Sequence, residues 1–479
     1  MTLELYNTLE REKQEFKPKE EGKVKFYSCG QTIYDDLHVG NARAYAVWDT
    51  LRRYLQHKGY TVRHVQNITD VGHLTDDGDQ GEDKVEKRAR ELGLEPMELV
   101  EDQIERYFED TKALNIQRQD IVPRATGHIS EMANYVQHIL NNGYAYEVDG
   151  NIYFDVEKFA QDYPYGEMAK KDLEQLKEEA KSRVEPDENK KNQYDFALWL
   201  NAEGSDHLMR WHQIFRINGE DKMITGYPGW HIECSVMSQK YLGDEFDIHA
   251  GGKDHIFPHH PNERAQAFAA TGKGQARYWI HNEFIQVEGE KMSKSKGNFY
   301  TVRELLDDGF SGDAIRLYLI SSHYRKETDF SLKGLEKAEK EVKKARNVVQ
   351  RIRKDPGSEM LDIVALEKDF EEHMDNDLNT AKAKQELMEF VSCASSELED
   401  GVKLDEEVAE KIEEFFEILG VTLDPEVSES EAGMADLLLD LREEARDEAD
   451  YETADMIRER LQELGFDVED IREGSMWTR

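Results

Sequence analysis

A strand–helix–strand pattern near the N-terminus restricts what this chain can fold into more than any other feature. Apolar periodicity predicts strands at Lys23–Ser28 and Thr61–Gln66, with an amphipathic helix at Ala42–His57 between them. Such a βαβ unit builds a parallel, doubly wound sheet. Sheets of this kind bind ligands at the carboxyl ends of their strands. We therefore expect an α/β fold with its site just beyond these strands.

Two short motifs, far apart in the chain, predict a polyphosphate site. His38-Val39-Gly40-Asn41 forms a glycine-containing turn at the helix start, where free N–H groups and the helix dipole favour a phosphate. Lys291-Met292-Ser293-Lys294-Ser295 places two ammonium groups in one short loop. The first motif alone is weak, because most such tetrapeptides are ordinary turns, whereas the second is far more specific.

Four widely separated residues are candidate metal ligands, namely Cys29, Cys234, His259 and Glu263. His259 and Glu263 lie four positions apart, so they share one face of a helix that we expect to begin near His259. Two thiolates, one imidazole and one carboxylate suit Zn²⁺, which accepts sulfur, nitrogen and oxygen ligands. The alternative is that each is an ordinary buried cysteine or surface histidine, because the spacing contains no C-x-x-C knuckle.

The cysteine count and the hydropathy pattern favour a cytoplasmic protein. The three cysteines, Cys29, Cys234 and Cys393, are too few and too scattered for a disulfide framework. No stretch approaches about 18 consecutive apolar residues, so we expect no membrane span. Met1–Lys23 lacks the apolar core of a signal peptide.

The net charge is unusually negative. The chain has 102 Asp plus Glu against 62 Lys plus Arg, which gives a formal net charge of −40. This pattern is compatible with an ordinary solvated acidic surface, or with adaptation to high salt, where repulsion between carboxylates is screened. We hypothesise a halophilic source. Against this background Lys333–Lys354 has nine basic residues and three acidic ones, which predicts either a solvated helix face or a contact with nucleic-acid phosphates.

Taken together, the motifs resemble the cysteinyl-tRNA synthetases, a family of class I aminoacyl-tRNA synthetases. The matching segments follow the family order and are Leu5–Leu9, Cys29–Asp35, Asn67–Asp70, Pro228–Cys234, Phe246–Asp254, Phe257–His260, Asp313–Arg316, Ser321–Arg325 and Gly474–Trp477. The resemblance implies an enzyme that activates L-cysteine with ATP and Mg²⁺ and releases pyrophosphate. It then transfers cysteine from the adenylate to the 3′-terminal adenosine of tRNA(Cys) and releases AMP.

The resemblance also implies roles for individual residues. The zinc ligands, for one ion per subunit, are Cys29, Cys234, His259 and Glu263. The cysteine pocket is lined by Gly30, Thr32, Thr69 and Trp230. ATP contacts His38, Gly40, Asn41, Gly251, Gly252, Asp254 and Lys294, and the catalytic residues are His38, Asn41, Lys291 and Lys294. A zinc-bound thiolate distinguishes cysteine from serine, which a pocket selecting by size alone cannot do.

The sequence departs from the family pattern at four places. Asn41 replaces a common histidine and donates a hydrogen bond without positive charge. Val71-Gly72-His73 replaces a frequent acidic pair, and Arg210–Tyr227 lacks the usual tryptophan and proline pattern, so the roles of both segments are open. Pro261 stands where an acid is common, near a helix start that tolerates proline.

The expected organisation is a Rossmann-like, doubly wound catalytic core with an inserted connective region, then a helical bundle and a small anticodon-binding module. Residues 1–125 and 226–332 form the core, and the insertion at 126–225 reads as charged helices and loops. The bundle at 333–423 contacts the tRNA stem, and 424–479 holds a linker, Asp424–Gly433, and the anticodon module.

A monomer is expected, and two alternatives remain. One is a related ligase that joins activated cysteine to an aminosugar and needs no anticodon module. The other is a catalytically silent paralogue that only binds. The C-terminal stripe Ala445, Ala449, Ala454, Ile457 and Leu461, ended by Gly465, predicts a helix and favours a retained tRNA module.

Overall fold

The chain divides into two compact units. The computed structural model describes residues 2–75, 81–171, 174–175, 187, 189–287, 289–291, 298–423, 429–464, 466–471 and 474–478. The first unit comprises Met1–Asp308, Ser322–Phe330 and Met374–Asn379, and the second comprises Gly309–Ser321, Ser331–His373 and Thr380–Arg479. None of the helices in these described ranges is long and apolar enough to cross a membrane.

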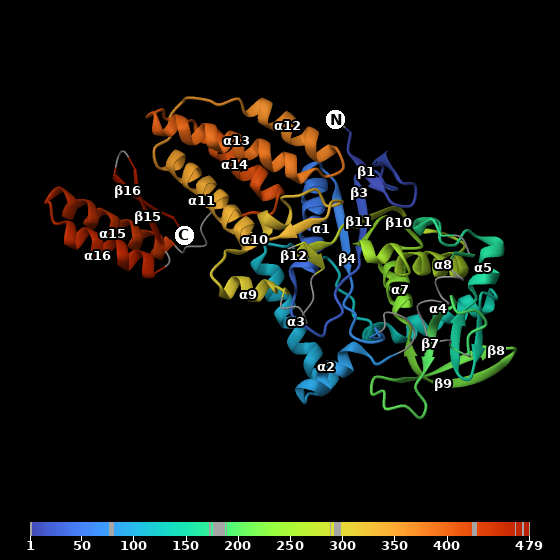
Figure 1. Cartoon of the computed structure of the whole chain (residues 1–479). Helices are drawn as coiled ribbons and strands as arrows, with labels where there is room; N and C mark the ends of the chain where they lie inside the picture. The colour runs from blue at the N-terminus through green and yellow to red at the C-terminus, as the bar shows by residue number, and fades with distance from the viewer. Residues whose placement is uncertain are drawn as a thin grey trace. The chain divides into compact units, whose positions relative to one another are not determined.

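Four parallel strands form the centre of the first unit (Figure 1), in the order β11 (Gln275–Asn282), β10 (Glu245–Gly252), β3 (Lys23–Ser28) and β4 (Thr61–Gln66). The β3 and β4 strands have the predicted bounds, and α1 (Val39–His57) connects them. Two chain connections lead from the centre of the sheet to its edges. From β3 the chain passes through α1 to the edge strand β4, and from β10 it passes through α8 (His259–Thr271) to the opposite edge strand, β11. Right-handed crossovers then place α1 and α8 on opposite faces of the sheet. The doubly wound α/β fold is confirmed.

The sheet is buried because helices cover both of its faces. Phe26 and Tyr27 of β3 and Trp279 of β11 are completely buried, and α1 buries a stripe that includes Trp48 and Tyr54. Both β3 and β4 are buried continuously near their carboxyl ends, as expected of strands that are covered on both faces. The strand order reverses between β3 and β10, and a crevice at such a switch point is where doubly wound sheets bind ligands.

The insertion contains a five-stranded antiparallel sheet that the sequence interpretation of charged helices and loops missed. Its order is β5 (Ala145–Val148), β6 (Asn151–Phe154), β7 (Phe196–Asn201), β9 (Glu220–Pro228) and β8 (Trp211–Ile217). In the β8–β9 ladder Ile214 faces Met223 and both are largely exposed, while Arg216 faces Asp221. Phe215 on the opposite face of β8 is buried, so apolar residues occur on both faces of this strand and the alternation that predicts strands is obscured.

The remaining elements of the first unit surround these two sheets. They are β1 (Glu4–Asn7), β2 (Glu12–Glu15), α2 (Lys84–Leu92), α3 (Pro96–Ala113), α4 (Ile129–Asn141), α5 (Val156–Asp162), α7 (Trp230–Leu242), β12 (Ile285–Val287), β13 (Glu290–Lys291), α9 (Val302–Asp307) and β14 (Thr328–Phe330), with short 3-10 helices at Thr126–His128, Glu167–Ala169 and Lys253–Ile256.

The second unit is mainly helical. Its helices are α10 (Gly312–Leu319), α11 (Leu332–Lys354), α12 (Ile363–Asp375, to His373 in this unit), α13 (Thr380–Glu399), α14 (Glu406–Ile418), α15 (Glu429–Asp447) and α16 (Tyr451–Glu463), followed by the hairpin β15 (Asp467–Ile471) and β16 (Gly474–Thr478). The long helix predicted at Lys333–Lys354 is α11.

Two predictions for the C-terminal segment need correction. Residues 429–433 of the expected linker belong to α15, and residues 424–428 lie outside the described part of the chain. The expected single helical stripe is two helices, because Ala449 adopts a left-handed φ of 60° and the Asp450 side chain caps α16. Ala449 is consequently exposed, whereas Ala445, Ala454, Ile457 and Leu461 are buried.

Candidate metal centre

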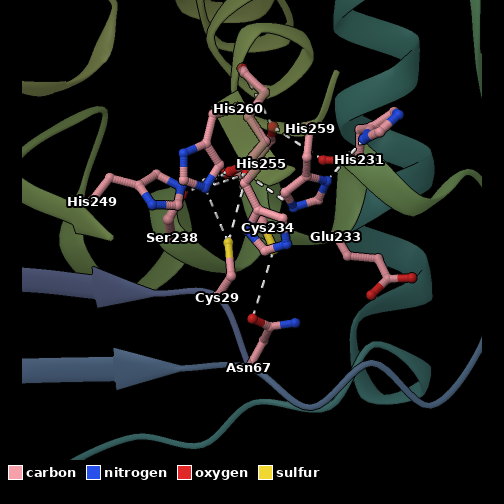
Figure 2. A network of polar contacts seen from close by, with 12 residues as sticks. Cys29, Asn67, His231, Glu233, Cys234, Ser238, His249, His255, His259 and His260 are labelled. Atoms are coloured by element: carbon pink, nitrogen blue, oxygen red, sulfur yellow. Dashed lines mark hydrogen bonds and ion pairs between the residues drawn. The ribbon is translucent and has the colours of Figure 1, made fainter. Parts of the chain in front are cut away.

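Three elements bring the four candidate ligands together, and Figure 2 shows three of these ligands, Cys29, Cys234 and His259, close to one another. Cys29 follows β3, and its N–H donates to the Ala250 carbonyl of β10 over 3.0 Å. Cys234 lies on α7, and the first turns of α8 carry His259 and Glu263, as the predicted helix start required. One ligand atom from each of the four residues lies within 4.8 Å of the others, and all four side chains are buried.

Glu263 lies at the centre of this cluster. Its Oε1 is 3.1 Å from Nε2 of His259 and 4.0 Å from Sγ of Cys29. The Cys234 thiol is 3.6 Å from the Asn67 side-chain oxygen. Cys29 and Glu263 also belong to an overlapping group with His249 and His260, and Nε2 of His260 is 3.3 Å from the Cys29 sulfur. The centre is therefore richer in histidine than the sequence motifs indicated.

Burial controls protonation at the centre. Burial, with Cys234 close by, raises the pKa of Cys29 well above the usual thiol value, and burial also raises the pKa of Cys234. Burial lowers the pKa of His259 well below its usual value, so its imidazole is neutral and has a free lone pair. Two thiols deprotonate in such a site when a cation compensates their charge. The donor set fits a borderline-soft divalent cation such as Zn²⁺.

Several histidines that the sequence did not identify as site residues contact the candidate ligands or one another. Nδ1 of His231 lies 2.8 Å from Nδ1 of His259, so this contact leaves Nε2 of His259 directed at the cluster. Nδ1 of His260 lies 2.8 Å from Nε2 of His281. His231, His249 and His260 lie inside the motif segments, but nothing in their spacing indicates which atom each ring nitrogen contacts.

The expected cysteine-pocket residues lie around the same centre. Thr32 and Thr69 pair as neighbours on parallel backbone segments. Trp230 begins α7, and its ring stacks on His259 with a centroid distance of 4.4 Å. The same indole also stacks on His73, at 4.1 Å and an interplanar angle of 9°. Trp230 is thus held rigidly between a candidate metal ligand and the loop that carries His73.

The Val71-Gly72-His73 loop has a structural role that the sequence left open. Nδ1 of His73 lies 2.5 Å from Oγ1 of Thr32, and its Nε2 lies 2.8 Å from Nζ of Lys84. Gly72 adopts φ 81°, and a Cβ there would lie 2.6 Å from the Pro228 carbonyl oxygen. A side chain at position 72 is therefore excluded both by conformation and by the close approach of the chain before α7.

Gly30 is required by packing. A Cβ at this position would lie 1.6 Å from the carbonyl oxygen of Asn67, because the chain beyond β3 passes directly beside the chain beyond β4. The Gly30 N–H donates to the Asn67 side chain over 2.9 Å, and Asn67 in turn donates to Thr69 over 3.0 Å. Asn67 therefore connects the pocket residues to Cys234, a role that its place in the Asn67–Asp70 motif did not reveal.

At the first nucleotide motif the structure differs from the sequence expectation. His38 is the N-cap of α1, and its Nδ1 accepts from the N–H groups of Gly40 and Asn41 over 3.1 and 3.3 Å. The first-turn donors expected to be free for a phosphate are therefore partly used by the cap. Burial lowers the pKa of His38 to about 4, so the ring is neutral at pH 7 and carries its proton on Nε2.

The residues that follow the Lys291–Ser295 motif contact the chain at the His38–Asn41 motif. Lys291 ends β13, while Lys294 lies outside the described residues, as do all positions from 292 to 297. The N–H of Val39 donates to the Tyr300 carbonyl over 3.0 Å, and the N–H of Val302 donates to Leu37 over 2.8 Å. The Phe299 ring lies 5.4 Å from the His38 ring.

The glycines at the end of β10 also have a steric reason. A Cβ on Gly251 would lie 2.6 Å from Nδ1 of His255, and one on Gly252 would lie 2.3 Å from Oδ1 of Asp254. Asp254 itself is exposed. These residues therefore lie at the carboxyl end of a central strand, beside the metal cluster and the switch point between β3 and β10.

Comparison with known proteins decides the family. Models for the class I (C) tRNA synthetase catalytic domain, the DALR domain and the cysteinyl-tRNA ligase anticodon binding domain match residues 15–340, 369–424 and 432–477. A cysteine–tRNA ligase from Thermus thermophilus is 45% identical over 497 residues, which cover 100% of this chain and 99% of the relative. The chain belongs to the cysteine–tRNA ligase family. A second such ligase, from Carboxydothermus hydrogenoformans, is 42% identical and covered completely, as is this chain.

Solved structures confirm the class I fold of this ligase family member. Mycobacterium tuberculosis methionyl-tRNA synthetase with methionyl-adenylate superposes with a TM-score of 0.54 at 16% identity, covering 87% of this chain and 94% of that one. The ternary complex of Agrobacterium radiobacter LeuRS with tRNA and LeuAMS gives a TM-score of 0.58 at 12% identity and covers 85% of each chain. The expectation of a class I synthetase enzyme is confirmed, and the match to an anticodon-binding domain argues against a ligase without such a module.

Proposed function

We propose that this chain selects cysteine through a zinc ion, activates it with ATP and transfers it to tRNA(Cys). The observation that carries the proposal is the buried cluster of Cys29, Cys234, His259 and Glu263, at the switch point of a class I synthetase core. Zinc held there supplies a soft Lewis acid that prefers a thiolate to the hydroxyl of serine. Family membership and a donor set of two sulfurs, one nitrogen and one oxygen support this assignment.

The amino-acid pocket is rigid because its wall is held from two sides. The stacked rings of His73 and His259 fix the indole of Trp230, while Thr32 contacts His73 and lies on a backbone segment that pairs with Thr69. A rigid wall places the substrate side chain against the metal cluster and its carboxylate toward the nucleotide. With Gly30, these residues orient cysteine, and they also exclude bulkier side chains.

The first step is attack of the cysteine carboxylate on the α-phosphorus of ATP, with pyrophosphate leaving. This transfer depends on in-line positioning and on neutralising charge. His38, neutral and protonated on Nε2, donates to the α-phosphate, and Asn41 donates to the bridging oxygen. Lys291 and Lys294 neutralise the β- and γ-phosphates with Mg²⁺. Gly40, Gly251 and Gly252 allow close approach of the nucleotide, and Asp254 accepts from the ribose.

The second step attaches cysteine to tRNA. A hydroxyl of the 3′-terminal adenosine attacks the activated carbonyl and AMP leaves. We assign residues 1–125 and 226–332 to the catalytic core, 126–225 to a connective insertion, 333–423 to a tRNA-contacting bundle and 424–479 to anticodon binding. The described part of the second unit is mainly helical, as such a bundle requires. The enzyme acts as a cytoplasmic monomer.

The test is cysteine-dependent ATP–pyrophosphate exchange by the full chain in molar KCl, with serine as the competing substrate. We expect exchange with cysteine and little with serine. Chelation of zinc is expected to abolish exchange, and zinc addition to restore it. Cys234→Ser should lose zinc and at least about 100-fold in kcat/KM, because a ligand and its charge are removed.

Cys393→Ser is the matched control, because Cys393 is an exposed cysteine of the second unit. It should retain both zinc and exchange. Zinc-loaded wild-type enzyme that activates serine as well as cysteine would contradict thiol selection by the metal. Exchange without any charging of tRNA(Cys) would instead contradict the proposed acceptor.

A further inference from the structure

The two carboxylate oxygens of Glu263 have different surroundings. Oε1 faces the cluster, 3.1 Å from Nε2 of His259. Oε2 has other partners: it lies 2.8 Å from Nε2 of His249 and 3.1 Å from Nε2 of Gln275. All of these side chains are buried, so water does not compete for the carboxylate. The Glu263 side chain is therefore fixed about its final torsion, with one oxygen presented to the cluster.

Gln275 has an unusual backbone for its residue type. It begins β11 with a left-handed φ of 72°, a conformation that is unfavourable for a non-glycine residue. Its side-chain amide group nevertheless makes two contacts, donating to Glu263 and, over 3.0 Å, to Oγ of Ser238 on α7. Only the amide nitrogen can donate to a carboxylate, so these contacts fix its orientation. Gln275 therefore holds a buried hydrogen-bond donor in one orientation from an unfavourable backbone conformation. Such a combination indicates that the donor is needed for the function of the site.

The second donor is fixed by packing against the sheet. His249 lies on β10, and its ring stacks on Trp279 of β11 with a centroid distance of 4.6 Å and an interplanar angle of 21°. Figure 2 places His249 and Ser238 beside the cluster, near His260 and Cys29. The two donors thus reach Glu263 from neighbouring strands of the central sheet, β10 and β11.

We propose that Gln275 and His249 are positioning residues that hold Glu263 as a one-oxygen metal ligand. This inference rests on the zinc site of the proposed function. Two donors on Oε2 prevent the carboxylate from rotating and from binding through both oxygens. A single, fixed oxygen ligand leaves room in the coordination shell for the thiolate of the substrate. Loss of either donor frees Glu263 to rotate, which weakens metal binding and the response of the metal to cysteine.

Two conservative variants remove the donors and keep the packing. Gln275→Leu deletes both amide hydrogen bonds and retains a side chain of similar size on the same left-handed backbone. His249→Phe keeps an aromatic ring against Trp279 and loses the donor. Gln266→Leu is the control, because Gln266 is buried on α8 and accepts from Ser235, while its Nε2 has no hydrogen-bond partner among the described residues.

The measurements are made on the full chain. Zinc affinity is obtained by competition with a chromophoric chelator, and the cobalt-substituted protein is examined by visible absorption with and without cysteine. We expect Gln275→Leu and His249→Phe to bind zinc about 10- to 100-fold more weakly, and their cobalt spectra to change. The KM for cysteine in pyrophosphate exchange should rise while the KM for ATP stays constant. Gln266→Leu should remain within about twofold of the wild type in zinc affinity.

Thermal unfolding with and without zinc separates positioning from general packing. A positioning role reduces the zinc-dependent increase in Tm, whereas a packing role lowers the Tm of the metal-free and zinc-loaded proteins equally. Unchanged zinc affinity and cobalt spectra in both variants would overturn this inference and leave the proposed function intact. Wild-type protein that fails to bind zinc would overturn the proposed zinc site itself.

Discussion

At the scale of single residues, burial of histidine makes this molecule sensitive to acid. His64 of β4 is almost completely buried, stacks on Phe26 at 4.3 Å and lies 2.8 Å from Oγ of Ser28. Burial, assisted by the positive charge of Arg52, lowers the pKa of His64 from 6.5 to about 3. Below pH 6.5 the His64 imidazole is therefore protonated in the unfolded chain, whereas in the folded chain it stays neutral until the pH approaches 3. The free energy of unfolding consequently falls as the pH decreases through this range.

Replacing His64 should flatten this pH dependence. Between pH 6.5 and 4 the His64 contribution amounts to about 3 kcal/mol, and His64→Gln cannot titrate there. We expect the urea midpoint of His64→Gln to fall less than that of the wild type over the same interval. His212→Gln, a change at an exposed histidine, should follow the wild-type curve. Parallel curves for His64→Gln and the wild type would show that this proton is not coupled to folding.

The sequence indicated the chemistry of the metal centre but not its supporting contacts. Cys29, Cys234, His259 and Glu263 could be proposed because their residue types form a zinc donor set, and the structure brings them together. Asn67, His73, His249 and Gln275 carry no such signal, because an amide or imidazole acquires its role only from the atom opposite it. Those atoms belong to elements far apart in the chain, and single-sequence patterns describe only local neighbours.

At the scale of elements, α11 has less free positive charge than its composition indicated. Lys333–Lys354 has nine basic residues and three acidic ones in the sequence, but several of these basic side chains pair with carboxylates. In the structure Arg346 pairs with Asp313, Arg353 pairs with Glu413, and Lys337 lies 3.5 Å from Glu341. The lysines at positions 333 and 340 are exposed along the helix. These lysines are the part of α11 best suited to phosphate contacts.

Charge reversal on α11 should therefore separate the two steps of the reaction. Lys333→Glu combined with Lys340→Glu is expected to reduce tRNA charging about tenfold or more at moderate salt, because two phosphate contacts become repulsive. Pyrophosphate exchange, which needs no tRNA, should be unchanged. Lys368→Glu with Lys382→Glu makes the same change in net charge on α12 and α13 and should have a smaller effect. Equal losses in both pairs would point to net charge alone.

The success of prediction at this scale followed the burial of each element. The β3 and β4 strands were predicted to the residue, because each begins with alternating exposed and buried positions and ends in buried ones. The β8–β9 ladder was missed because Ile214 and Met223 point to solvent. The break between α15 and α16 at Ala449 was also missed, since alanine favours helix and only the tertiary structure requires its left-handed conformation.

At the scale of the whole molecule, the balance of charge dominates. A formal net charge of −40 on 479 residues opposes both the compact fold and the approach of tRNA. Ion pairs such as Lys23–Glu20 and Lys240–Glu131 use part of the limited basic charge at the surface. The excess acids are therefore compensated mainly by dissolved cations. Salt shortens the range of their repulsion, from about 10 Å at 0.1 M to about 3 Å at 1 M.

The enzyme should therefore require salt. We expect Tm to rise by about 5 °C or more between 0.1 and 2 M KCl, and pyrophosphate exchange to be fastest above about 0.5 M, because screening relieves repulsion within the fold. Exchange is the appropriate assay, since tRNA binding weakens with salt for its own electrostatic reasons. Charging of tRNA should accordingly have a lower salt optimum than exchange. An exchange optimum below about 0.2 M KCl would contradict adaptation to high salt and favour an ordinary acidic surface.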